Sequence, residues 1–421
     1  MFRRRFRSRP PRTALLAALS LLFLAACSET DSPSDPGVDL PPVTDSSGAL
    51  PTLRNEPGDF TLDAHRTELE VVVPPSGTWV LRDRATGSLL TADGWAFDGP
   101  LAEAGVRLPH LAKTSAFWFA WSVFHPGSEI WGRDTDVRDA VIRSDEDCLV
   151  PCDQIRRNLP RDAIPSLPNT GPPQGAPRFT DAGSSDAAYL QPHDMVIGLF
   201  DGTEARAYPH NVLWWHEIVN DTFGGQPLSV SFCPLTGSAL VFSAQQSAFG
   251  VSGNLYNSNL VLYDHDTASL FSQMRREAVT GARKGEVIEE IPFVETTWER
   301  WEQMHPGTRV IASSTGFSRD YTRYPYGDYR SDDRDTFAVT DPAPDAQFPG
   351  KALVTGVHAG GTSKVYVHSV VRQSMGNRAV FRDEVGGLPV WVLYDSTATF
   401  LQIVHAGDPE FELDLEWTRL P

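Results

Sequence analysis

Short segments in which apolar and polar residues alternate recur along the chain from about residue 57. Residues 57–110 contain the stretches LEVVV, TWVLRD and SLLTADGWAF, which Gly and Pro residues separate. A two-residue period interrupted by turn formers is typical of half-buried β-strands. The sequence has no long stretch with the period of an amphipathic helix. The pattern therefore predicts a β-rich α+β fold that begins with a small β unit at residues 57–135.

A second pattern is a repeat within the larger part of the chain, at residues 136–421. Residues 196–212 (VIGLFDGTEARAYPHNV) resemble residues 354–370 (VTGVHAGGTSKVYVHSV), and a Gly-Gly turn follows each segment. Each copy predicts a strand, a turn, a second strand, a short helix and a further hairpin. We predict that duplicated units, at about residues 196–242 and 354–404, form one large mixed β body.

A comparison of the two copies separates scaffold positions from candidate functional positions. Tyr208 recurs as Tyr366, and the Gly-Gly turn recurs as well, which favours an architectural role for both. His216 has no histidine counterpart in the second copy, and Cys233 falls opposite an aspartate. These two differences favour His216 and Cys233 as positions where a function was added to a repeated frame.

The first residues of the chain have the pattern of an export signal. The opening stretch MFRRRFRSRPPR holds six arginines and no acid, and an apolar run follows from Ala14 to Ala26. This run is too short for a transmembrane helix, which needs about 20 residues, and is typical of a secretory signal. The Leu-Ala-Ala before Cys27 matches the bacterial lipobox. We therefore predict a lipoprotein signal peptide at residues 1–26 and lipid on Cys27, with an ordinary signal peptide as the alternative.

The composition after Cys27 predicts how the folded body is held at a membrane. Residues 27–56 are rich in Ser, Asp, Pro and Gly, and such a stretch buries too little apolar surface to fold. We predict a disordered tether there. Ser28, which stands where an aspartate would retain the protein at the inner membrane, favours the outer membrane if the host has two membranes. The body would then lie in the periplasm or at the cell exterior, after export by the general or the twin-arginine route.

The charge of the chain excludes one class of partner. Removal of residues 1–26 takes away six arginines and no acid, which changes the formal net charge from −18 to −24. Binding to nucleic acid requires a basic surface, so we expect no nucleic-acid partner. Attraction to anionic headgroups is equally disfavoured, and contact with the bilayer is expected through the acyl chains of Cys27.

Three cysteines remain after lipidation of the fourth. Cys148 and Cys152 lie in the sequence CLVPC and are close enough for a local disulfide, although two unpaired cysteines in a loop would fit as well. An odd number of cysteines in an oxidising compartment leaves one thiol over. If the local bridge forms, Cys233 is that thiol.

The densest run of motifs lies between residues 206 and 239, and it resembles a known family. The segments RAYP (206–209), HEIVND (216–221) and CPLTGSA (233–239) are similar to blocks of the bacterial domain-of-unknown-function family 3179. The segments RDAIPSL (161–167), FGVSGNLYNSNLVLYDHDTASLFSQM (249–274) and TTWERWEQMHP (296–306) resemble further blocks. Many members look like Cys-Pro-Leu-Cys where this chain has Thr236. The resemblance, over about residues 145–400, therefore implies no dithiol mechanism here, and it names no activity.

The chemistry of these segments favours a site centred on Cys233. A thiol becomes a nucleophile when a histidine or a positive charge lowers its pKa. His216 and Arg206 are candidates for that role, and Glu217 is a candidate to orient a histidine. A transition metal held by His210, His216 and Cys233 is a further hypothesis. Equally, Cys233 is a candidate buried, inert thiol, and His216 a candidate core histidine bonded to backbone.

Several polar residues are candidates to line a pocket near these groups. We include Tyr208, Asn220, Asp221, Ser252, Tyr256 and Asn257. Such residues also satisfy backbone groups in turns, so a structural role is the alternative. The sequence contains no P-loop and no dinucleotide fingerprint, so no nucleotide cofactor is expected.

Three hypotheses for the function follow from the sequence. The first is an envelope enzyme or metal protein centred on Cys233 and His216. The second is a non-enzymatic envelope module that binds a ligand or a protein partner through the repeated β body. The third is a purely structural lipoprotein. The residues themselves name no substrate.

Overall fold

The computed structural model describes residues 73–141, 144–168, 176–245, 247–338, 340–406 and 413–421. The chain divides into two units, residues 1–50 and residues 51–421, and every described residue belongs to the second unit. The predicted signal peptide, the lipidated Cys27, the tether at 27–56 and the first part of the N-terminal β region lie outside the described residues.

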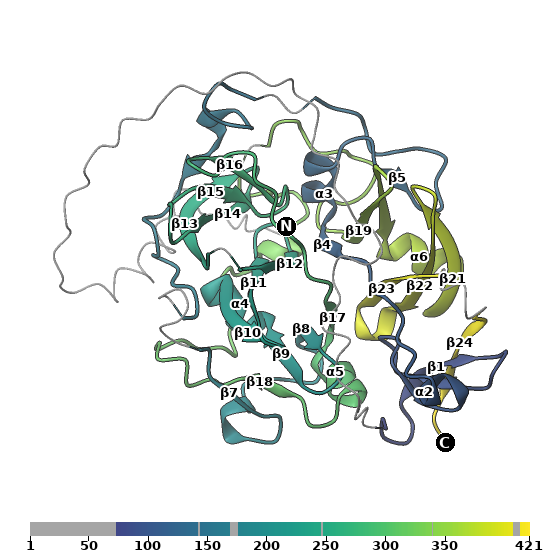
Figure 1. Ribbon diagram of the computed structural model, residues 1–421. Coiled ribbons are helices and arrows are strands. Elements are labelled where there is room, and N and C mark those ends of the chain that lie inside the picture. The colour runs from purple at the N-terminus through teal and green to yellow at the C-terminus, as the bar shows by residue number, and fades with distance from the viewer. Residues whose placement is uncertain (1–72, 142–143, 169–175, 246, 339, 407–412) are drawn as a thin grey trace, which may run out of the picture. The chain divides into compact units, whose positions relative to one another are not determined.

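Strands dominate the described part of the chain, and they form five sheets that short helices connect (Figure 1). The β-rich α+β class predicted from the two-residue hydrophobic period is therefore confirmed. Among the described residues, no helix has both the length and the apolar composition needed to cross a membrane.

Two modules with the same order of elements make up most of the body. The first module, residues 195–243, comprises β8 (Met195–Phe200), β9 (Ala205–Pro209), α4 (His210–His216), β10 (Ile218–Phe223), β11 (Gln226–Cys233) and β12 (Ser238–Ser243). The second module, residues 353–405, comprises β19 (Leu353–Ala359), β20 (Thr362–Val367), α6 (His368–Met375), β21 (Arg378–Val385), β22 (Leu388–Asp395) and β23 (Phe400–His405).

Each module also pairs with a strand–helix–strand segment. The segment beside the first module is β17 (Val294–Thr297), α5 (Trp298–Met304) and β18 (Arg309–Ile311). The segment beside the second module is β4 (Lys113–Phe117), α3 (Trp118–Phe124) and β5 (Glu129–Ile130). In both cases the first strand pairs antiparallel with the opening strand of the module, and the last strand pairs parallel with the next strand.

The same close contact recurs in both modules between a glycine and a tryptophan. A Cβ atom on Gly198 would lie 2.4 Å from the Trp301 ring, and one on Gly356 would lie 1.9 Å from the Trp121 ring. Both tryptophans are fully buried. A glycine is therefore required at each position for the helix to pack on its sheet. The equal order, pairing and packing agree with the predicted repeat, whose origin by duplication stays a prediction.

The two modules are joined through β4. Strand β12 of the first module pairs with β4 at Ala239 and Ser115, and β4 pairs along its length with β19 of the second module. The resulting seven-stranded sheet has the order β10-β11-β12-β4-β19-β20-β5. A separate five-stranded sheet has the order β17-β8-β9-β18-β7, with β7 at Phe179–Asp181.

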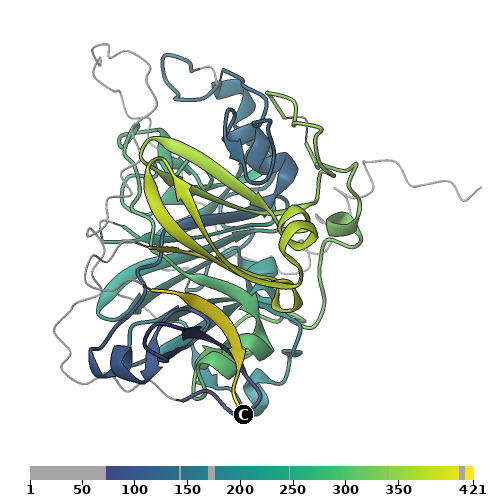
Figure 2. The same cartoon turned by 90° about the vertical axis from the view of Figure 1, so that its right-hand side faces the viewer.

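The hairpins of the second module form a sheet of their own. Strands β21, β22 and β23 are consecutive antiparallel neighbours, and Figure 2 shows them in lime to yellow, facing the viewer. Strand β23 also lies next to β17. Each module therefore contacts the strand–helix–strand segment that pairs with the other module.

The remaining strands form two smaller sheets. One contains β13 (Phe249–Tyr256), β14 (Asn259–Asp264), β15 (Leu270–Ser272), β16 (Glu277–Thr280) and β6 (Arg156–Arg157). The other contains β1 (Trp79–Asp83), β2 (Leu89–Leu90), β3 (Ala96–Asp98) and β24 (Leu415–Arg419), and the short α2 (Pro100–Glu103) follows β3.

Two strand pairings cross the predicted boundary near residue 135, which stays a prediction. The N-terminal strand β1 pairs with the C-terminal strand β24 over five residues. Strand β4, also N-terminal to the boundary, lies in the middle of the seven-stranded sheet. Strands that are distant in sequence pair here, and a local hydrophobic pattern does not encode such partners.

Candidate functional site

A cavity of about 390 Å³ lies where the two modules meet. Its walls come from both modules and from both strand–helix–strand segments. Apolar and aromatic side chains line much of it, namely Phe117, Trp214, Phe232, Pro234, Tyr324, Leu353, Val354 and Leu401. Seven charged or histidine side chains also line it, namely Lys113, His193, Asp194, His210, Glu295, Arg330 and His368. An apolar cavity with a few converging polar groups is the usual form of a small-molecule site.

His210 and Glu295 form a buried pair in this cavity. Pro209 ends β9 in an extended conformation, so that His210 becomes the first residue of α4. The Nε2 atom of His210 lies 3.1 Å from Oε1 of Glu295 on β17, which is an ion-pair distance, although the N–H is not aligned for a hydrogen bond. The His210 ring also contacts the Phe232 ring, with the centroids 4.1 Å apart.

The Glu295 carboxylate is stabilised by the side chains around it. Burial by itself raises the pKa of Glu295, but His210 and Lys113 oppose burial, and together with Ser115 they hold the pKa below its usual value. Glu295 is therefore ionised at neutral pH. A buried carboxylate of this kind orients a histidine and balances a nearby positive charge.

Lys113 brings an amine into the same cavity. It is the first residue of β4, it is buried, and its Nζ atom donates a hydrogen bond to the Leu401 carbonyl oxygen at 2.7 Å. Burial lowers the pKa of Lys113 to about 8, and the Glu295 carboxylate opposes that effect. A substantial fraction of Lys113 is consequently the neutral amine at weakly alkaline pH.

His368 occupies in α6 the place that His210 occupies in α4, and both histidines line the cavity. The Nε2 atom of His368 lies 2.9 Å from the Thr355 hydroxyl. Burial, together with the positive charge of Lys113, lowers the pKa of His368 to about 4. His368 is therefore neutral at physiological pH and contributes a hydrogen-bonding group.

Aromatic and charged residues from three segments line another part of the cavity. Trp214 on α4 and Tyr324 contact each other edge to face at 5.0 Å between ring centroids. The Arg330 guanidinium lies over the Tyr324 ring at 4.8 Å. Asn211 donates a hydrogen bond to the Asp194 carboxylate at 3.1 Å. These residues add a polar and aromatic wall to the cavity.

The predicted nucleophile Cys233 does not line this cavity. On β11 successive side chains point to opposite faces, so Phe232 faces the cavity and Cys233 points away from it. Cys233 is buried, and its sulfur lies 3.8 Å from the Ser258 carbonyl oxygen. Burial, and the carboxylate of Glu217 nearby, raise the pKa of Cys233 to about 11. Burial thus favours the protonated thiol at neutral pH, and these surroundings give the expected thiolate no support.

His216 is a core histidine and does not contact Cys233. Its Nδ1 atom lies 2.8 Å from the Pro165 carbonyl oxygen, and its Nε2 atom lies 2.7 Å from the Tyr321 hydroxyl. Burial lowers the pKa of His216 to about 4. The structural interpretation, a buried histidine bonded to backbone, is the one that the geometry supports.

Glu217 ends α4 in an unusual conformation. Its backbone has φ 57° and ψ −31°, and its side chain is buried. The Tyr326 hydroxyl donates a long hydrogen bond to its Oε1 atom, at 3.5 Å. Burial raises the pKa of Glu217 to about 8. Glu217 therefore lies near Cys233, and its carboxyl group bonds to a tyrosine hydroxyl and not to a histidine.

Arg206 belongs to a network that both modules share. It donates hydrogen bonds to the carboxylates of Glu204 and Asp221, and the Tyr208 hydroxyl donates to Asp221 at 2.7 Å. In the second module Lys364 and Tyr366 donate in the same way to Asp383. The recurrence indicates that Arg206, Tyr208 and Asp221 stabilise the frame.

The other predicted pocket residues bond mainly to backbone. Asn220 donates to the Phe249 carbonyl, Ser252 donates to the Val261 carbonyl, and Asn257 bonds to both backbone groups of Asp341. Tyr256 is buried and packs against Phe124. The lining of the cavity includes none of the six predicted pocket residues.

The proposed metal ligands do not converge. His210 faces Glu295, His216 faces Pro165 and Tyr321, and Cys233 lies on the opposite face of β11 from the cavity. Within the described ranges, no group of three or more His, Cys, Asp or Glu side chains is placed to hold a metal ion. The structure therefore does not bring His210, His216 and Cys233 together at one site.

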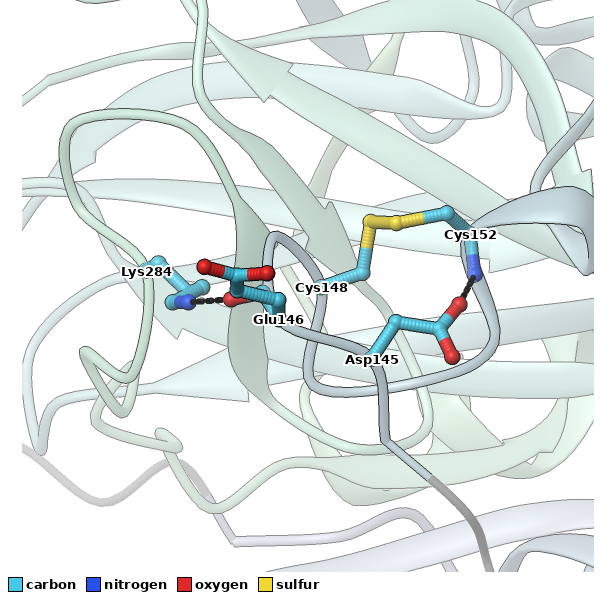
Figure 3. Close-up of a disulfide and its surroundings, with 5 residues drawn as sticks. All are labelled: Asp145, Glu146, Cys148, Cys152 and Lys284. Carbon is cyan, nitrogen blue, oxygen red and sulfur yellow. Dashed lines mark hydrogen bonds between the residues drawn. A yellow bond between two sulfur atoms is a disulfide. The ribbon is translucent and has the colours of Figure 1, made fainter. Parts of the chain in front are cut away.

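The local disulfide predicted from the CLVPC spacing is present (Figure 3). Cys148 and Cys152 are bridged, and Cys233 is the free cysteine among the described residues. The Asp145 carboxylate accepts a hydrogen bond from the Cys152 backbone N–H at 2.6 Å, and Lys284 donates to the Glu146 carbonyl at 2.7 Å. The bridge stabilises a loop and lies outside the cavity lining.

The fold and the cavity define a β-rich body of two similar modules with a small-molecule-sized site between them. Residues 161–409 match the model of the family described as Protein of unknown function (DUF3179). The chain belongs to this family. No curated protein and no solved structure matches the chain.

Sequence reasoning missed Lys113, Glu295 and His368. Lys113 and Glu295 lie on strands outside the two modules, and neither belongs to a recognisable catalytic motif. The usable signal was the repeat itself, since His210 and His368 recur at equivalent positions at the start of a helix. The pairing of the modules brings both histidines to one cavity.

Proposed function

We propose that this protein binds a small organic molecule in the cavity between its modules. The observation that carries the proposal is the convergence there of Lys113, His210, Glu295 and His368 within a largely apolar and aromatic lining. Burying such groups costs free energy, and a purely structural contact does not require them. The apolar wall would contact the body of the ligand, and the ionisable groups would fix its orientation.

This proposal corresponds to the ligand-binding hypothesis that the sequence left open. The alternative, chemistry at Cys233 and His216, has weaker geometric support. The thiol and the imidazole bond to different partners, and burial raises the pKa of Cys233 to about 11. His210 and Glu295 share the cavity and can transfer protons, and the His210 Nε2 atom lies 3.1 Å from the Glu295 Oε1 atom.

The proposal is tested by filling the cavity from its edge. Leu353 lines the cavity and is 43% exposed, so a Trp at this position can extend inward without displacing a fully buried side chain. We expect the wild type to enhance the fluorescence of an apolar anionic dye, anilinonaphthalene sulfonate, in a saturable manner. Leu353→Trp should weaken that binding by about 10-fold or more, because it removes volume that the dye needs.

Val287→Trp is the matched control, since Val287 is 40% exposed and does not line the cavity. It should bind the dye as the wild type does. Equal weakening by both substitutions, or no saturable binding by a folded wild type, would contradict a binding function for the cavity.

We further propose that the body is exported and anchored to a membrane through lipid on Cys27. The support is the arginine-rich start, the apolar run from Ala14 to Ala26, and the lipobox that ends at Cys27. Stable anchoring needs more than one acyl chain, and lipoprotein modification supplies several. The cavity would then face the periplasm or the cell exterior and receive ligands from there.

A further inference from the structure

The use of lysine in this chain is unusual. The sequence contains four lysines, Lys113, Lys284, Lys351 and Lys364, against 32 arginines. Arg forms ion pairs and stacks on aromatic rings at least as well as Lys, but its guanidinium stays charged and does not act as a nucleophilic amine. A lysine that lines a buried cavity in so arginine-rich a chain therefore suggests that a neutral amine is needed there.

We propose that Lys113 binds an aldehyde or ketone ligand covalently, as a reversible imine, inside the cavity. This inference rests on the proposed function and adds the chemical class of the ligand. It requires three conditions: an accessible nitrogen, a fraction of free amine, and groups that move protons in the same space.

The surroundings of Lys113 meet the first two conditions. Its side chain lines the cavity, and the Leu401 carbonyl holds Nζ at 2.7 Å, which fixes the amine at the cavity wall. The Phe293 ring lies 5.5 Å from the same nitrogen. This apolar burial lowers the pKa of Lys113 to about 8, so about half of the side chain is free amine at pH 8.

The third condition is met by His210 and Glu295. The His210 ring lies beside the ionised carboxylate of Glu295, and both side chains line the cavity with Lys113. An imidazole next to a carboxylate can pass a proton to a bound molecule and take it back. His368 remains neutral, so it adds no positive charge that would repel a protonated imine.

The reaction balances without any further reagent. The free amine of Lys113 adds to the carbonyl carbon, and the carbonyl oxygen takes up a proton to give a carbinolamine. Loss of that oxygen as water then leaves a carbon–nitrogen double bond. One amine and one carbonyl compound give one imine and one water, and hydrolysis reverses the reaction.

Reductive trapping tests the proposal. The mature protein is incubated at pH 8 with benzaldehyde and sodium cyanoborohydride, which adds hydride to the imine carbon and leaves a stable benzylamine. Peptide mass mapping then measures the label on each lysine. We expect Lys113 to carry at least about 10-fold more label than any other lysine. Benzyl alcohol, which has the same ring but no carbonyl group, should compete with benzaldehyde for the cavity and reduce the labelling of Lys113.

Lys351 is the matched control, and it separates cavity access from the effect of a low pKa. Burial lowers the pKa of Lys351 to about 7, yet its Nζ lies 3.2 Å from the centroid of the Tyr329 ring and its side chain does not line the cavity. Lys351 should remain unlabelled. Labelling of Lys351 equal to that of Lys113 would overturn the proposal, because amine pKa alone would then explain the reaction.

Two further measurements distinguish failure of the inference from failure of the proposed function. Lys113→Arg should abolish the trapping, while Lys351→Arg should not change it. If benzyl alcohol displaces the fluorescent dye from the wild type but Lys113 stays unlabelled, the imine is refuted and the binding function stands. If neither compound displaces a bound dye and no label forms, both proposals are refuted.

Discussion

Glu217 shows how one residue links the strain at a helix end to the acid–base behaviour of the core. Its backbone lies in a region with positive φ that side chains rarely adopt, at a cost of about 1–3 kcal/mol. The backbone carbonyl of Glu217 accepts the Phe232 N–H at 2.8 Å, which joins the end of α4 to β11, and the Glu217 carboxyl group is buried. Burial keeps this carboxyl group protonated at neutral pH, with a pKa of about 8.

Glu217→Gln should make the fold less sensitive to alkaline pH. The folded-state pKa lies above the usual value for glutamate, so the folded state holds a proton that the unfolded state loses between about pH 4.5 and pH 8. The free energy of unfolding of the wild type therefore falls as the pH rises through that window. Gln cannot ionise, and we expect the variant to gain about 2–4 kcal/mol relative to the wild type between pH 5 and pH 8.

The measurement is urea unfolding of both proteins at several pH values, analysed as the difference between them. The contribution of the buried histidines to the free energy of unfolding cancels in this difference, because they titrate equally in both proteins. Glu103→Gln changes an exposed glutamate and should leave the difference flat. A Glu217→Gln profile parallel to that of the wild type would show that the carboxyl group is ionised in the folded protein.

At the scale of elements, each module depends on a helix that packs directly on its sheet. The rings of Trp121 and Trp301 lie over Gly356 and Gly198, where any side chain would occupy the same space. This contact sets the distance of α3 and α5 from the strands beneath them. The helix and the glycine come from separate segments of the chain, so the contact also joins each module to its strand–helix–strand segment.

Gly356→Ala should therefore destabilise the protein strongly. The new Cβ would lie 1.9 Å from Trp121, and a fully buried indole has little room to move. We expect a loss of about 3 kcal/mol in the free energy of unfolding, since overpacking of a dense core typically costs about 1–3 kcal/mol. Gly183→Ala is the control, because a Cβ at that position would meet no other atom within 4 Å. A loss within about 0.5 kcal/mol of that control would contradict the packing argument.

At the scale of the whole molecule, the two modules together form the cavity, because each contributes part of its lining. The cavity takes His210 and Trp214 from the first module, and His368 and Leu353 from the second. Lys113 and Glu295 come from the strands that pair with them. A single module would supply half of these groups, so the site depends on the association of both.

The proposed anchor is a property of the whole molecule and is tested in the host. Cys27→Ser should shift the protein from the membrane fraction to the soluble extracytoplasmic fraction and abolish labelling by an azide-tagged fatty acid. The reason is that the acidic body, at a net charge of −24 without residues 1–26, has no electrostatic attraction to anionic lipid. Cys233→Ser, a change to a buried thiol, should leave fractionation unchanged. A Cys27→Ser protein that remained membrane-bound and lipid-labelled would refute the anchor.

The sequence by itself determined the local features of this protein. Period-two patterning and turn residues specified the β-rich class, the CLVPC spacing favoured the Cys148–Cys152 bridge that the structure contains, and contiguous motifs specified the family. These features depend on residues close together in the chain. The site depends instead on strand pairing at long range, which joins Ser115 to Ala239 and places Lys113 near Glu295. Only the tertiary structure decided that Cys233 faces away from the cavity while His210 faces into it, because burial and strand partners set the direction of each side chain.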